Sequence, residues 1–301
     1  MNPSNLNPSK LEQFGASMLE HLPPVKAPDR IWTAVEAALD RPPVRRRRWT
    51  HLLVPLAAAA ALVYWAIPRH GVRWDVVRIH GAEHVTGKIA AGQWIETDGG
   101  SRATVTVGSI GTVDVSPNTK LRVVATKPGD HRFALSRGEI HATISAPPRL
   151  FFVETASGTA VDLGCEYSLR SGEDGEGLLQ VTRGWVSFQW NGVESLVPAG
   201  ASCRTRAEGG PGIPYFDDAS ESFRQALDNP TSLDTVLSAA RARDTLSLWH
   251  LLWRVPPADR ARVYDRMAAL TPVPEGVSRD LALRLDPATL ARWKDELAWT
   301  W

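Results

Sequence analysis

Alternating apolar and polar residues characterise the middle of the chain, from residue 72 to about residue 206. The alternation is clearest in residues 103–107, 140–144 and 186–190, and residues typical of turns separate such runs. Successive side chains of a strand point to opposite faces, so the pattern predicts strands with one buried and one hydrated face. We therefore expect a mainly β domain over residues 69–206.

A short motif occurs twice within these predicted strands. Residues 135–140 (LSRGEI) return as residues 181–186 (VTRGWV), 46 residues later. The shared glycines, Gly138 and Gly184, permit a sharp bend or a bulge where a new strand begins. The echo predicts a repeated strand–corner–strand unit rather than a nucleotide-binding loop.

The apolar period becomes helical after Tyr215. The apolar stripes occupy residues 233–240, 248–255, 263–270 and 290–297. Asp244 is the predicted cap of the second stripe, and Asp286, which is followed by proline, is a typical helix start. We expect residues 215–301 to form short helices packed as a small bundle or a solenoid-like stack.

Residues 51–67 form a long apolar run, and none of residues 52–67 is charged. A helix of this length extends about 25 Å, close to the thickness of a bilayer's hydrocarbon. The run therefore predicts one transmembrane helix over residues 49–68, which contacts the lipid bilayer through residues 51–67. A signal peptide and a buried core helix are the alternatives.

Four consecutive arginines, Arg45, Arg46, Arg47 and Arg48, directly precede this run. Basic residues concentrate on the cytoplasmic side of a membrane helix, so the N-terminus is predicted to be cytoplasmic. Residues 1–48 are then a short cytoplasmic segment. The predicted strands and helices lie in the periplasm, as expected for a single-pass protein of the inner (cell) membrane.

The cytoplasmic segment contains one predicted amphipathic helix, over residues 29–39. Ile31, Val35 and Leu39 share a face, which makes them candidate partner-binding residues. One short helix is not stable alone, so the segment either docks on a partner or serves as a tether.

Composition and charge narrow the function classes. The chain has 34 Lys+Arg against 33 Asp+Glu and a formal net charge of +1, so no global basic field attracts nucleic acid. His80 and His84 are four residues apart, but they fall in predicted strands on either side of Gly81, so metal binding is not expected. No cofactor fingerprint, phosphate loop or catalytic triad is recognisable. We expect a protein that is not an enzyme and binds no cofactor.

Cys165 and Cys203 each end a strand-like run of the β domain. The segment from 165 to 203 contains 39 residues, and closing it would stabilise the fold by about 4 kcal/mol in the chain-entropy model. Both cysteines fall in the half of the chain predicted to face an oxidising space. A disulfide between them is therefore the expectation, with two separate buried thiols as the alternative.

Tryptophan is concentrated near the C-terminus, where the last 58 residues hold five of the twelve. Trp249 and Trp253 are one turn apart on a predicted helix. They either complete the helical core or form a partner-facing patch, because tryptophan is common among interface anchors. Trp299 and Trp301 could equally pack against the β domain.

A series of short stretches in the β segment has a recognisable order and spacing. They are residues 92–97, 100–103, 111–117, 135–140, 152–155, 161–167, 181–186 and 197–200. In these stretches, which span about residues 72–205, the sequence resembles the FecR family of periplasmic sensor-regulators. The glycines of the matching motifs are Gly138, Gly164, Gly184 and Gly200.

The resemblance implies a twisted, solenoid- or sandwich-like β domain held outside the inner membrane by one preceding helix. It also implies signal transduction, in which the outer domain binds an extracytoplasmic protein and the cytoplasmic tail controls a sigma factor. A membrane sensor that relays a protein signal is therefore the leading hypothesis. The alternative is a non-signalling envelope scaffold or adhesion protein anchored in the inner membrane.

Overall fold

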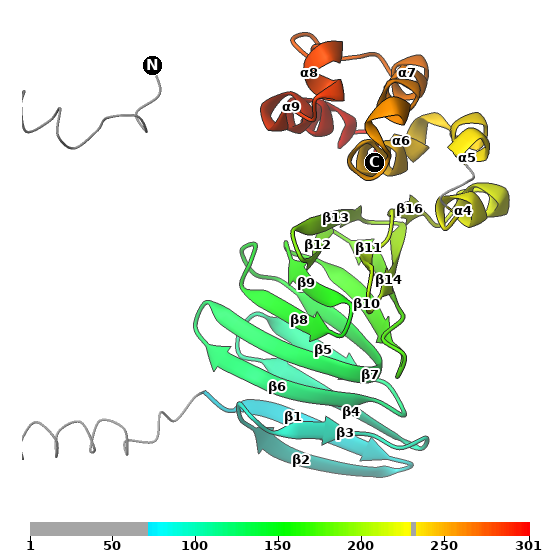
Figure 1. Ribbon diagram of the computed structural model, residues 1–301. Helices are drawn as coiled ribbons and strands as arrows, with labels where there is room; N and C mark the ends of the chain where they lie inside the picture. Colours follow the sequence, from blue (N-terminus) through cyan, green and yellow to red (C-terminus); the bar gives the residue numbers. More distant parts are fainter. Residues whose placement is uncertain (1–71, 230–232) are drawn as a thin grey trace, which may run out of the picture. The chain divides into compact units, whose positions relative to one another are not determined.

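The computed structural model describes residues 72–229 and 233–301. The apolar run 51–67, the arginines at 45–48, and the helix face of Ile31, Val35 and Leu39 lie outside these described residues. Within the described ranges, no helix combines the length and hydropathy that crossing a bilayer requires. The described chain consists of a mainly antiparallel β domain followed by a helical part (Figure 1).

The described β domain is built from sixteen strands, which confirms the mainly β prediction. The strands are β1 (Trp74–His80), β2 (Glu83–Ile89), β3 (Trp94–Glu96), β4 (Ser101–Val107), β5 (Gly111–Val115), β6 (Lys120–Lys127), β7 (Asp130–Ile144), β8 (Phe151–Thr155), β9 (Gly158–Asp162), β10 (Glu166–Ser171), β11 (Gly177–Arg183), β12 (Trp185–Trp190), β13 (Val193–Pro198), β14 (Ala201–Arg206), β15 (Gly210–Pro211) and β16 (Tyr215–Phe216).

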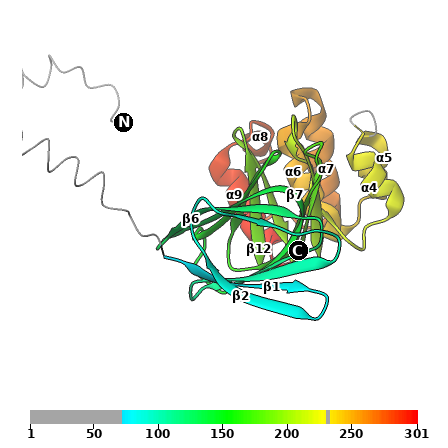
Figure 2. The same cartoon turned by 90° about the horizontal axis from the view of Figure 1, so that it is seen from below.

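The strands pair into two sheets that share the long strand β7. The first sheet has the order β2-β1-β4-β5-β7-β10-β11-β14, and β15 and β16 both pair with β14. The second sheet has the order β3-β6-β7-β8-β9-β12-β13, and its β7–β8 pair is parallel. In Figure 1 the strands stack from β2 at one end to β13 and β16 at the other, where the helices follow. Seen from below in Figure 2, β1 and β2 lie in front of the helices.

Strand β7 passes from the second sheet into the first at Gly138. Residues up to Arg137 pair with β6, and residues from Gly138 onward pair with β10. Gly138 has a φ of +94°, and a Cβ atom there would lie 2.5 Å from the Cα of Thr119, so only glycine fits. Gly184 makes the reverse crossing between β11 and β12, with a φ of +73°. The echoed motif therefore forms the predicted strand–corner–strand unit.

The core of the β domain lies between the inner faces of the two sheets. Phe133 packs between Trp74 and Phe151, whose ring centroids lie 5.1 and 5.9 Å from its own. Val105 and Ile140 from the first sheet are fully buried in the same cluster. Burying a large apolar side chain stabilises a fold by roughly 1.5–3 kcal/mol, so this cluster is the main source of the domain's stability.

Six α-helices and two short 3-10 helices follow in the described residues. They are α4 (Glu221–Leu227), α5 (Leu233–Ala239), η2 (Ala242–Asp244), α6 (Thr245–Arg254), η3 (Pro257–Asp259), α7 (Arg260–Leu270), α8 (Arg279–Leu283) and α9 (Pro287–Leu297). The predicted apolar stripes supply their common core, in which Leu248, Leu252, Met267 and Trp293 are buried.

The two predicted helix caps have different outcomes. Asp286 accepts a hydrogen bond from the backbone N–H of Thr289 at 2.8 Å, which confirms the predicted start of α9. Asp244 occupies the predicted N-cap position of α6, but its side chain makes no capping hydrogen bond there. Its carboxylate instead accepts the backbone N–H of Arg241 at 2.8 Å, because the 3-10 turn η2 directly precedes α6.

Candidate functional site

Side chains of helix α6 contact the free edge of strand β13. Among the described strands, β13 pairs with β12 alone, so backbone groups on its other edge need different partners. The backbone N–H of Leu196 in β13 donates to Nε2 of His250 in α6 at 2.9 Å. The other ring nitrogen, Nδ1, lies 2.9 Å from the carbonyl oxygen of Leu246. A carbonyl can only accept, so Nδ1 carries the hydrogen and the imidazole is neutral.

The environment of His250 agrees with this neutral form. The residue is 2% exposed, and burial lowers the pKa of His250 to about 4. A charged imidazolium would have to donate from both nitrogens, and Nε2 could no longer accept the N–H of Leu196. The contact between helix and strand therefore depends on an uncharged histidine.

Two further polar residues of α6 bind the β domain beside His250. The guanidinium of Arg254 donates to Oγ of Ser195 at 3.0 Å and to the carbonyl of Pro211 at 2.9 Å. The hydroxyl of Ser247 donates to the carbonyl of Pro214 at 2.7 Å. Side chains from one face of the helix thus bind two backbone carbonyls and one hydroxyl of the β domain.

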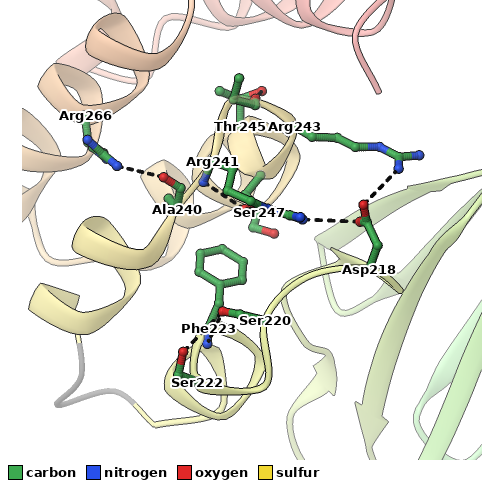
Figure 3. Close-up of polar contacts among 12 residues, drawn as sticks. Asp218, Ser220, Ser222, Phe223, Ala240, Arg241, Arg243, Thr245, Ser247 and Arg266 are labelled. Atoms are coloured by element: carbon green, nitrogen blue, oxygen red, sulfur yellow. Dashed lines mark hydrogen bonds and ion pairs between the residues drawn. The ribbon is translucent and has the colours of Figure 1, made fainter.

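Ion pairs join the turn before α6 to the turn after β16. Asp218 accepts hydrogen bonds from Arg241 at 3.2 Å and from Arg243 at 3.5 Å (Figure 3). Arg243 also lies over the ring of Phe216, 3.9 Å from its centroid. The guanidinium of Arg241 makes two more bonds, of 3.0 and 3.1 Å, to Asp244, which is 1% exposed.

We call the contact between α6, with the turn before it, and the β domain the junction. Four tryptophans form a continuous row across the junction, which we call the tryptophan row. Trp185 in β12 contacts Trp301, Trp301 contacts Trp249, and Trp249 contacts Trp253, with centroid separations of 6.2, 6.4 and 6.1 Å. The indole N–H of Trp249 donates to the carbonyl of Leu290, which fixes its ring against α9. The row connects the β domain to the surface of α6.

The tryptophan row separates two alternatives that the sequence left open. Trp249 is partly buried and packs against the helical core, whereas Trp253 at the end of the row is 41% exposed. Trp301 packs against the β domain and donates its indole N–H to Thr245 at 3.1 Å, while Trp299 is 87% exposed. Trp253 is therefore the member of the row that a partner can reach.

The histidine pair of the first hairpin does not converge. His84 pairs with Ile79 and His80 with Glu83, so the two imidazoles lie on opposite faces of the β1–β2 ribbon. Within residues 72–229 and 233–301, no three His, Cys, Asp or Glu side chains are grouped to hold a metal ion.

The predicted disulfide between Cys165 and Cys203 is wrong, since both are free buried thiols. Leu169, Leu179 and Cys203 are paired across β10, β11 and β14, and Cys165 precedes Leu169 by four residues. Two strand spacings of about 4.8 Å and four residues of about 3.3 Å place the cysteines roughly 16 Å apart. A disulfide needs Cα atoms within about 7 Å, so strand β11 prevents the bond.

A buried carboxylate at the corner after β9 escaped the sequence analysis. Asp162 accepts the backbone N–H of Gly164 at 2.7 Å and contacts the thiol of Cys165. Burial raises the pKa of Asp162, and burial followed by the charge of Asp162 raises the pKa of Cys165. The thiol is therefore a hydrogen-bond donor that holds the corner. The short spacing Asp-x-Gly-Cys was the available signal.

The glycines singled out in the sequence all occupy corners of the β domain. Gly138, Gly164, Gly184 and Gly200 have φ values of +94°, +91°, +73° and +76°. Gly200 lies next to the junction, where a Cβ atom would come 3.5 Å from Nη2 of Arg243. Their roles are structural, and Gly200 places the strand end against which the arginine packs.

Comparison with known proteins gives one family match. Residues 93–187 match the family model described as FecR protein. Two crystal structures of a candidate anti-sigma factor from Parabacteroides distasonis are similar at 18% identity, each with a TM-score of 0.37. The similarity covers 44% of this chain and 63% of that chain, which is less than two thirds of its length. Among curated proteins, no match is found.

Proposed function

Since residues 93–187 form a FecR domain, we propose that this protein is a single-pass membrane regulator that binds an extracytoplasmic protein and transmits the signal inward. The predicted transmembrane helix over 49–68 anchors it in the inner membrane. The predicted helix face of Ile31, Val35 and Leu39 binds a cytoplasmic partner of the sigma-factor type. Its mechanism is binding, without bond chemistry and without a cofactor.

The exposed end of the tryptophan row carries the proposal for the outer partner. Trp253 offers a large apolar surface, because its side chain is 41% exposed. Its ring packs edge-to-face against the ring of Trp249, with 6.1 Å between the ring centroids. Tryptophan residues supported in this way are the commonest interface hot spots, whose removal costs about 2 kcal/mol or more of binding free energy. We assign the extracytoplasmic partner to this surface of α6.

The position of Trp253 suits a signal that must reach the FecR domain. The same helix carries His250 and Arg254, which bind the edge of β13 through Leu196 and Ser195. A partner that displaces or rotates α6 therefore changes the packing of a strand in the second sheet.

Photocrosslinking in cells tests the outer partner. A photoreactive amino acid at position 253 should capture one extracytoplasmic protein, and the same group at Gln180, an exposed site on the first sheet, should not. Trp253→Ala should weaken binding of that captured protein by at least about tenfold. Leu281→Ala is the matched control, because Leu281 is also exposed, at 43%. Equal weakening by both substitutions would contradict the assignment.

Deleting residues 1–44 tests the signalling half of the proposal. A reporter gene whose promoter is read by the cytoplasmic sigma-factor partner should lose its response to the outer partner when the protein is truncated. An unchanged response argues for the scaffold alternative, in which the N-terminal segment serves only as an anchor. The distinction is reinforced by copurification, since a regulator brings down a cytoplasmic factor and a scaffold does not.

A further inference from the structure

The exposed apolar side chains of the described β domain gather at one end. Val72, Val85 and Trp94 are 52%, 49% and 43% exposed, and all three lie within residues 72–94. The other large apolar side chains of comparable exposure, Trp253, Leu281 and Trp299, belong to the helical part. Isolated exposed apolar residues are ordinary on a protein surface, but their confinement to one short segment of the β domain, residues 72–94, is not.

Strands β2 and β3 form this end of the domain. β2 is the last strand of the first sheet and β3 the last strand of the second, and each has one strand partner among the described strands. Figure 1 shows both at the end of the strand stack opposite the helices. We call this region, together with Lys120 and Arg122 of the adjacent strand β6, the β2–β3 end.

The two sheets end unevenly, which explains the exposure of Val85. Strand β2 has seven residues and β3 has three, so β3 covers only part of the inner face of the β1–β2 hairpin. The uncovered part opens into a hollow of about 320 Å³ lined by residues that include Arg78, Val85 and Ile95. Val85 therefore stands at the rim of the domain, where a single strand could not bury it.

Trp94 lies beside two positive charges. The ammonium of Lys120 is 5.1 Å and the guanidinium of Arg122 is 5.8 Å from the centre of its ring. The ammonium of Lys120 also forms an ion pair with Glu96, with 3.6 Å between Nζ and Oε1. Among the described residues, no carboxylate forms an ion pair with Arg122. An exposed indole flanked by cations combines an apolar surface with groups that attract anions.

We propose that the β2–β3 end rests on the surface of an anionic membrane. Trp94 and Val85 enter the headgroup region, as amphipathic rings and short aliphatic groups do at bilayer interfaces, and Lys120 and Arg122 bind lipid phosphates. The inference rests on the membrane anchor of the proposed function. Four residues lie between Ile67, the last residue of the predicted lipid contact, and Val72, so their Cα atoms are at most about 18 Å apart along the chain.

A second copy of the chain fits this end less well. Of the seven residues of β2, only Ile89 is buried, and the exposed ones include one aliphatic side chain, Val85, among polar and charged residues. Stable protein interfaces bury about 800 Å² per partner, which such a strand does not supply in apolar form. Lipid headgroups need no shape complementarity and accept the mixture of indole and cations.

Fluorescence of the full-length protein in vesicles tests the proposal. Val85→Cys, labelled with an environment-sensitive nitrobenzoxadiazole group, is compared with Glu208→Cys in the exposed turn after β14. The native thiols are buried, so labelling is selective for the introduced cysteine. In vesicles of phosphatidylcholine with phosphatidylglycerol, we expect roughly twofold stronger emission at position 85 than in phosphatidylcholine alone, and no change at position 208.

One double variant and two controls test the interpretation. Lys120→Gln combined with Arg122→Gln should abolish the difference between anionic and neutral vesicles while leaving thermal unfolding unchanged. A label at 85 that iodide quenches as strongly as the label at 208 overturns the proposal. So does protection of the label in detergent without lipid that grows with protein concentration, because this marks a second copy.

The same vesicles separate this inference from the proposed function. Flotation and resistance to carbonate extraction measure the membrane anchor independently of the label. A protein that floats and resists carbonate with a hydrated label at position 85 retains its anchor, and only the surface contact is wrong. A protein that does not float overturns both statements.

Discussion

The imidazole of His250 accepts the backbone N–H of Leu196 at 2.9 Å, and this bond joins a helix to the edge of a sheet. The two residues are 54 positions apart in the chain. An open strand edge is a site of aggregation and of unwanted pairing, and proteins commonly cover it. Here the neutral imidazole of α6 accepts one N–H of this edge, so the contact between helix and sheet requires an uncharged histidine.

Substituting the ring tests this requirement. His250→Ala leaves the N–H of Leu196 buried without an acceptor and opens a cavity, so we expect unfolding free energy to fall by about 2–4 kcal/mol. Chemical denaturation measures the change. Gln180→Ala, at an exposed position of β11, is the control and should change stability by less than about 0.5 kcal/mol. A loss at His250 no larger than the control's would contradict the assigned bond.

The same histidine predicts a pH dependence. Its pKa is about 4 in the folded protein against an ordinary value of 6.5. Because the unfolded chain binds the proton more tightly, the stabilisation is complete above pH 6.5 and is lost as the pH falls from 6.5 towards 4. The full difference corresponds to about 3 kcal/mol. Stability of the wild type and of His250→Ala should converge over this interval, and parallel pH profiles would refute the prediction.

Two of the corner glycines, Gly138 and Gly184, should tolerate no side chain. Gly184→Ala brings a Cβ to 2.1 Å from the carbonyl oxygen of Gly164, and Gly138→Ala brings one to 2.5 Å from the Cα of Thr119. We expect each to lower the unfolding free energy by about 3 kcal/mol or to prevent folding. Gly192→Ala is the matched control, since Gly192 has a similar φ of +79° with nothing within 4 Å. It should lose only about 1 kcal/mol, as measured by thermal or chemical unfolding.

Arg241 and Arg243 should differ in importance although both bind Asp218. Arg241→Ala removes the guanidinium from Asp244, which is 1% exposed, so we expect a loss of about 3 kcal/mol. Arg243→Ala removes an exposed pair and a contact with Phe216, and about 1 kcal/mol is expected. Denaturant midpoints at equal slope give the comparison. The reverse order would show that Asp218, not Asp244, governs the junction.

The two cysteines give a direct chemical test of the sheet topology. Without reductant, the native protein should not react with an aromatic disulfide reagent, because both thiols are buried and burial raises the pKa of each. In guanidinium chloride, two thiols per chain should react. Detection of none after unfolding would restore the disulfide and contradict the separation of Cys165 from Cys203 by β11.

Local periodicity predicted the elements of this protein well. Alternation in residues 103–107 and 140–144 became β4 and the second half of β7, and the stripe at 263–270 became part of α7. The repeated motif around Gly138 and Gly184 correctly indicated corners. These features depend on neighbouring residues, since side-chain direction repeats every two residues in a strand and every 3.6 in a helix.

Long-range features were predicted less well. Cys165 and Cys203 both end strand-like runs, yet the pattern did not reveal that β11 lies between them. Asp244 is a residue type that commonly caps helices. Its carboxylate instead accepts hydrogen bonds from Arg241, three residues earlier, and makes no capping bond to α6. In both cases a contact set by strand order or by a competing charge decided the outcome.

The sequence by itself determined the strands, the helices, the corner glycines and the similarity to FecR proteins, because these depend on residue spacing within short stretches. Only the tertiary structure decided which face of α6 meets β13, that Trp253 is the accessible end of a tryptophan row, and that the apolar residues 72, 85 and 94 share one end. The physical reason is that these relationships arise when sheets close over a core. Residues such as Leu196 and His250 then become neighbours, although nothing in their local sequence links them.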